Sequence, residues 1–148
     1  MNPSIVSQDD RPSAILGLED GCSSAVGVIV GAGISLDSRA LLVAAVSLAV
    51  AASFSMGGGL WLSNGSKRQA VVMALATFIG SFAPALPWLF TEGALAFGLC
   101  GAIAIGLGVI IAEIRPGKPL SSYVVTFSVL LVATGAAVGA SLIAGALA

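Results

Sequence analysis

Two adjacent acidic residues, Glu19 and Asp20, interrupt a stretch that is otherwise apolar from about residue 14 to residue 34. A charge near the centre of a membrane-spanning helix costs about 2.5–3.5 kcal/mol on insertion scales, so such residues are rare. A carboxylate held away from water takes up a proton or binds a cation, and the two compete for the same oxygens. The pair therefore indicates proton-coupled cation chemistry, with Asp20 and Glu19 as candidate metal ligands. The alternative is that both acids lie at the membrane interface and interact favourably with a helix N-terminus.

A third candidate metal ligand is Met56, which precedes three glycines, Gly57 to Gly59, in a second apolar stretch. Its thioether is a soft ligand that suits Fe(II) or Cu(I) better than Mg²⁺ or Ca²⁺. Methionine also fills apolar cores, and the residue type alone does not separate these two roles. The chain has no histidine, which excludes an imidazole metal site or proton relay. Because no pair of nucleophile and base is evident, we expect no enzymatic activity, and any metal ion would be a transported substrate rather than a cofactor.

The elements that must position these residues are membrane-spanning helices. Hydrophobic residues make up 57% of the 148 residues and charged residues 9%, and the mean hydropathy is +1.07. A soluble domain has about 25% charged residues, so this chain cannot cover a globular surface with polar groups. The apolar runs are continuous rather than alternating, which favours helices over a barrel. We predict an all-α membrane protein with a polar N-terminal tail (1–13) and a domain of five transmembrane helices (14–148), whose spans cover about 14–34, 40–62, 70–90, 94–114 and 122–147.

Basic residues fall mainly on one side of the predicted membrane. Five basic residues share one side: Arg11, Lys67, Arg68, Arg115 and Lys118. Only Arg39 lies on the opposite side. Because cytoplasmic loops carry an excess of lysine and arginine, we predict a cytoplasmic N-terminus and a C-terminus outside. The net charge of −1 gives no indication of a nucleic-acid partner, and we expect none.

Glycines and prolines recur in the predicted spans. Gly135 and Gly139 have GxxxG spacing in the fifth span. Small residues let helix backbones approach closely in lipid, and we expect this pair to pack within the chain, with a dimer face as the alternative. Pro84 and Pro87 are expected to kink the third span.

The two cysteines, Cys22 and Cys100, both lie in apolar stretches and form no CxxC motif. We interpret them as free, buried thiols. A metal-binding or redox pair is the alternative interpretation.

Three stretches, in order along the chain, resemble the vacuolar iron transporter family. Residues 17–21 (G-L-E-D-G) are similar to the family's G-L-x-D-G signature in the first span. Residues 55–68 (S-M-G-G-G-L-W-L-S-N-G-S-K-R) resemble its S-M-x-x-G-E-[aromatic]-[aliphatic]-S-x-x-S-x-R stretch at the end of the second span. Residues 83–88 (A-P-A-L-P-W) are similar to its paired-proline third span. Five spans with a cytoplasmic N-terminus also fit, so the resemblance covers nearly the whole chain.

The resemblance implies a homodimer with a translocation path between the two first spans. Members of the family move Fe²⁺, and often Mn²⁺, out of the cytosol in exchange for protons. By position, Asp20 would be the membrane metal ligand and Met56 the soft ligand, each supplied twice by the dimer. Glu19 stands where the family usually has Asn, and could add a ligand or a second proton site. The expected location is the lipid bilayer of a prokaryotic inner membrane, as a multi-pass protein.

The chain also departs from the family pattern. Leu60 and Gln69 stand where the family has glutamates. Many members insert a long, glutamate-rich cytoplasmic domain between the second and third spans, where this chain has only the short loop 63–69. The cytosolic metal-collecting station of those members is therefore expected to be missing here.

Two other functions remain open from the sequence. A proton-coupled exporter of organic cations would also use a carboxylate in its first span. Such carriers tend to surround the acid with aromatic side chains, whereas here aromatic residues are 6% of the chain and none lies in the first span. In a non-transporting membrane subunit, the glycines would serve packing and the acids would be interfacial.

Overall fold

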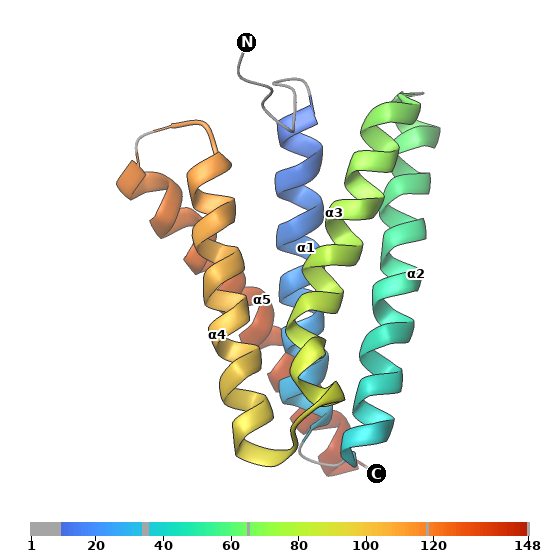
Figure 1. Cartoon of the computed structure of the whole chain (residues 1–148), viewed down its shortest axis with the longest axis vertical. Coiled ribbons are helices and arrows are strands. Elements are labelled where there is room, and N and C mark those ends of the chain that lie inside the picture. The colour runs from blue at the N-terminus through green and yellow to red at the C-terminus, as the bar shows by residue number, and fades with distance from the viewer. Residues whose placement is uncertain (1–9, 34–35, 65, 118, 148) are drawn as a thin grey trace.

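The computed structural model describes residues 10–33, 36–64, 66–117 and 119–147, and the regular elements in them are all helical (Figure 1). Their order is α1 (Arg11–Ala32), α2 (Ser38–Asn64), α3 (Lys67–Ala85), the 3-10 helix η2 (Leu86–Leu89), α4 (Gly93–Ile114) and α5 (Pro119–Leu147). Five helical segments, with η2 continuing α3, are long and apolar enough to cross a bilayer. The prediction of five spans is confirmed, and the five apolar helices indicate a multi-pass membrane protein.

The helices extend further into polar sequence than predicted. Helix α1 begins at Arg11, so residues 11–13 of the predicted tail are helical; residues 1–9 lie outside the described part of the chain. Pro12 occupies the first turn of α1, where its missing N–H would have no helical partner in any case. Between the second and third spans, α2 continues to Asn64 and α3 begins at Lys67, so most of the predicted loop 63–69 is also helical.

Helix α1 lies in the middle of the bundle. It packs most extensively against α3 and also contacts α5, α2 and α4, whereas α2 packs mainly against α3 (Figure 1). The start of α1 and the α2–α3 and α4–α5 connections lie at one end of the bundle, and the C-terminus lies at the other (Figure 1). The first of these ends carries Arg11, Lys67, Arg68 and Arg115, and the opposite end carries Arg39.

Glycines allow α1 and α3 to come into backbone contact. A Cβ atom added at Gly17 would lie 2.7 Å from the carbonyl oxygen of Met73, and one added at Gly80 would lie 2.6 Å from that of Leu18. Both distances are too short for any side chain, so this contact requires glycine on both helices. The four-residue spacing of Gly17 and Gly21 thus serves close helix packing in lipid.

The glycines of α5 differ from those of α1 in their packing. Gly27 and Gly31 of α1 pack against Ala137 and Ser141 of α5, but a Cβ added at Gly135 or Gly139 would meet no described atom within 4 Å. The expectation that Gly135 and Gly139 pack within the chain is therefore wrong. The side of α5 that faces α1 is formed by Ala137 and Ser141, and the two glycines lie off that side.

A compact apolar cluster stabilises the end of the bundle opposite to the start of α1. Ile29, Leu41, Ala45, Ala85, Trp88, Ala96 and Cys100 pack together there, and the ring of Phe97 meets Trp88 edge-on at 4.9 Å between centroids. Helix α3 continues through the buried Pro84 to Ala85, and the 3-10 helix begins at Leu86, one residue before the second proline, Pro87. Cys22 and Cys100 are free and buried, as predicted.

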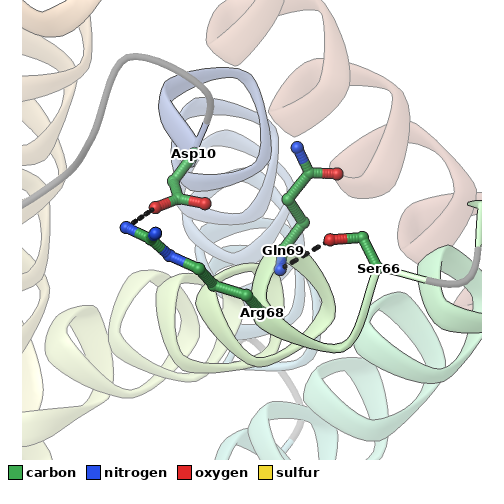
Figure 2. A network of polar contacts seen from close by, with 4 residues as sticks. All are labelled: Asp10, Ser66, Arg68 and Gln69. Carbon is green, nitrogen blue, oxygen red and sulfur yellow. Dashed lines mark hydrogen bonds and ion pairs between the residues drawn. The ribbon is translucent and has the colours of Figure 1, made fainter.

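Polar contacts join the beginnings of α1 and α3. The Oδ2 atom of Asp10 lies 2.6 Å from Nη2 of Arg68, and the hydroxyl of Ser66 accepts a hydrogen bond from the backbone N–H of Gln69 at 3.4 Å (Figure 2). Ser66 is thus the N-cap of α3. This stretch, which includes Ser66 and Arg68 of the second motif, therefore has a structural function at the end of the bundle.

Candidate metal-binding site

The two adjacent acids of α1 have different surroundings. Consecutive residues on a helix point about 100° apart, so the side chains of Glu19 and Asp20 diverge. Glu19 is buried, and its Oε2 atom lies 2.7 Å from Nη2 of Arg115, in the segment that follows α4. Asp20 is half-buried, and no side chain among the described residues forms an ion pair or hydrogen bond with its carboxylate. One acid is therefore matched within the chain and the other is free to bind.

The Glu19–Arg115 pair ties α1 to the connection between α4 and α5. Both groups are largely removed from solvent, with side-chain exposures of 10% for Glu19 and 22% for Arg115. The second carboxylate oxygen, Oε1, is buried without a hydrogen-bond partner among the described atoms. A buried charge needs a partner of opposite sign, and Arg115 supplies it. Sequence reasoning did not find this pair, although the basic residues that follow the fourth span, on the same predicted side of the membrane as the start of the first, were a visible signal.

Asp20 lies deeper in the membrane-spanning helix than a span starting at residue 14 would place it. It is nine residues after Arg11 and twelve before Ala32 in α1, which at the helical rise corresponds to about 14 Å and about 18 Å along the axis. The first turn of α1 contains no acidic residue. Favourable contact with the helix N-terminus fades within the first turn and so does not explain Asp20.

The open row of α1 consists of Leu16, Asp20 and Ser24, which follow one another at intervals of about one turn. Leu16 is exposed, and Asp20 and Ser24 are half-buried, whereas residues 13–15, 17, 19, 21–23 and 25 are buried. The other four helices therefore cover most of the upper half of α1 and leave this row accessible. The unpaired carboxylate is therefore on a side of α1 that the other helices leave accessible.

Met56 is half-buried on α2, the helix that packs mainly on α3. Its neighbour Gly57 faces α3, where an added Cβ would lie 2.8 Å from the carbonyl oxygen of Ala70. The core contact of α2 with α1 lies at the other end of the bundle, where Leu41 and Ala45 meet Ile29. In the described part of the chain, no group of three or more His, Cys, Asp or Glu side chains is placed to hold a metal ion. A single chain thus offers separate ligands rather than a closed site.

No protein-family model, curated protein or solved structure matches this chain. The fold defines a class, that of multi-pass membrane proteins with five apolar helices.

Proposed function

We propose that the chain works as a homodimer that exports Fe²⁺ or Mn²⁺ from the cytosol in exchange for protons. The observation that carries this proposal is the Asp20 carboxylate, which is near the middle of α1, has no described partner and belongs to the open row. A charge at this depth is costly unless it faces a partner or a polar cavity. A second copy of the chain, docked through the open row, brings a second Asp20 and a place for a cation between the two carboxylates.

The ligand chemistry of such a dimer favours a transition metal ion. Two Asp20 carboxylates provide hard oxygen ligands, and Met56 from each α2 adds a soft sulfur, a combination that suits Fe²⁺ better than Mg²⁺ or Ca²⁺. The charge of Glu19 is already balanced by Arg115 at 2.7 Å, so we assign Glu19 to holding α1 in place. The resemblance of residues 17–21 and 55–68 to the vacuolar iron transporter family supports the same assignment of Asp20 and Met56.

Proton coupling follows from the same two carboxylates. A divalent ion binds them only in their deprotonated form, and two protons restore neutrality after the ion leaves. Each carboxylate in the dimer therefore alternates between metal-bound and protonated states, which exchanges one divalent ion for two protons.

The direction of transport depends on the orientation of the helices. Arg11, Lys67, Arg68 and Arg115 lie at the end of the bundle where α1 begins, and Arg39 lies at the other end. The excess of basic residues on the cytoplasmic side favours a cytoplasmic N-terminus and an external C-terminus. We propose a prokaryotic inner membrane as its location.

Transport by reconstituted protein tests the proposal. Vesicles with an acidic lumen should take up Fe²⁺ or Mn²⁺ and lose luminal protons, and Asp20→Asn should lower the initial rate by more than about tenfold, since even outer-shell partners of a metal contribute 10–100-fold. The control is Glu92→Gln, an equivalent acid-to-amide change at an exposed residue whose side chain makes no cap hydrogen bond. Equal rates for Asp20→Asn and the parent would refute the site, and uptake that ignores the pH gradient would refute the coupling.

A further inference from the structure

A hollow of about 520 Å³ opens where α1 begins and α4 ends. Its charged lining consists of Arg11, Glu19 and Arg115, and its apolar lining includes Ile15 and Leu16. The hollow lies beside Glu19, on a different side of α1 from the Asp20 carboxylate. Apart from Leu16, which also belongs to the open row, its lining is separate from the residues assigned to metal transport.

The hollow favours a phosphate-sized anion. Two arginines face one carboxylate, which leaves one uncompensated positive charge, and Arg11 forms no ion pair within the described residues. Guanidinium groups match the geometry of phosphate.

Glu19 places a second requirement on a ligand in the hollow, a hydrogen-bond donor. Its side chain is only 10% exposed, and its Oε1 atom is buried without a donor in the described structure. A carboxylate oxygen only accepts hydrogen bonds, so it needs an N–H or O–H group close to the anion. Side chains of a helix lean toward its N-terminus, which directs Glu19 toward the arginine-lined part of the hollow.

The apolar lining indicates where such a ligand comes from. Ile15 and Leu16 line the hollow next to the charged groups, and Leu16 is 51% exposed on the outer surface of a membrane-spanning helix. Leu16 also begins the open row, so the hollow opens toward the bilayer at the edge of the proposed dimer contact. Basic pockets between membrane helices are known binding places for lipid headgroups.

We propose that the hollow binds a phospholipid whose headgroup combines a phosphodiester with a hydrogen-bond donor, as in ethanolamine and glycerol headgroups. The phosphodiester pairs with Arg11 and Arg115, the donor binds the carboxylate of Glu19, and the acyl chains leave the hollow over its apolar lining, at the edge of the open row. The lipid thereby fills the space that the Glu19–Arg115 pair spans between α1 and α4. This inference does not depend on the metal that the chain carries or on whether it carries one.

Native mass spectrometry of the purified protein, equilibrated with an equimolar mixture of three lipids, tests the proposal. Phosphatidylethanolamine and phosphatidylglycerol should be retained about tenfold more than phosphatidylcholine, which has the phosphate but no headgroup donor; this is the effect of one charge-assisted hydrogen bond. Equal retention of phosphatidylcholine, or no retained lipid on the parent protein, would overturn the proposal.

Two matched variants place the lipid at the hollow. Arg11→Gln should reduce retention of the two preferred lipids about tenfold, Arg11→Lys should reduce it less, and Arg39→Gln, at the opposite end of the bundle, should leave it unchanged. Equal losses in Arg11→Gln and Arg39→Gln would contradict the assignment. Soluble glycerophosphoethanolamine, which lacks acyl chains, should not displace the lipid at millimolar concentration; displacement would identify the ligand as a free phosphoester and overturn the lipid assignment.

Discussion

The two sides of α1 differ in what they contribute to the molecule. On the covered side, Gly17 and Gly21 bring the backbone against α3, and Glu19 is paired with Arg115. On the open row, Asp20 is half-buried and has no partner among the described side chains. The difference shows that two adjacent acids of the same helix can have very different surroundings. The covered side fixes the position of α1, and the open row presents a carboxylate that is available for binding.

The largest expected effect on stability comes from breaking the charge pair on the covered side. Glu19→Leu leaves the guanidinium of Arg115, which is 22% exposed, without its carboxylate, and should lower the free energy of unfolding by about 3 kcal/mol. Arg115→Leu should do the same, whereas the double variant should lose less than either single variant, because an apolar pair replaces a buried ion pair. Unfolding in detergent by a chemical denaturant measures all three. Additive losses in the double variant would show that the pair does not stabilise the fold.

A smaller effect is expected where α1 touches α3. The Cβ atom of Gly21→Ala would lie 2.9 Å from the backbone nitrogen of Ser81 and closer still to the carbonyl oxygen of Thr77. Such overpacking should cost about 1–3 kcal/mol in the free energy of unfolding. Gly58→Ala is the matched control, since a Cβ there meets nothing within 4 Å, and it should leave stability unchanged or raise it by up to about 1 kcal/mol. If the two variants have the same free energy of unfolding, the close α1–α3 contact does not exist in the protein.

The smallest effect on stability is expected on the open row. Leu16→Cys replaces an exposed side chain and should change the free energy of unfolding by less than about 0.5 kcal/mol. In membranes it should nevertheless give an oxidised, covalently linked dimer, because the proposed homodimer docks through this row. The two native cysteines are buried and should not react. Ile105→Cys, at an exposed residue of α4, is the control; equal cross-linking of both variants would contradict docking through α1.

The five spans could be predicted because continuous apolar runs of sufficient length leave few other folds. The ends of these helices could not be predicted, because polar residues such as Arg11 and Ser63 extend the helices through backbone hydrogen bonds. GxxxG spacing occurs in α1 and in α5, and only the packing shows that Gly21 is covered and Gly139 is not. Local patterns carry no information about which helix faces which.

The sequence predicted which residues form the candidate site but not the surroundings of each side chain. The rarity of acids in a span identified Glu19 and Asp20 together. Their different roles depend on Arg115, which is 96 positions from Glu19 in the chain. Met56 belongs to a different helix from Asp20, and no local pattern in the sequence places the two relative to each other.

Metal binding by the purified protein tests the central claim most directly. Equilibrium titration of the detergent-solubilised protein with Fe²⁺ or Mn²⁺ should give one tightly bound ion for every two chains. Binding should be lost in Asp20→Asn and kept in Glu92→Gln. An Asp20→Asn protein that binds the same ion with the same stoichiometry and affinity would contradict the account.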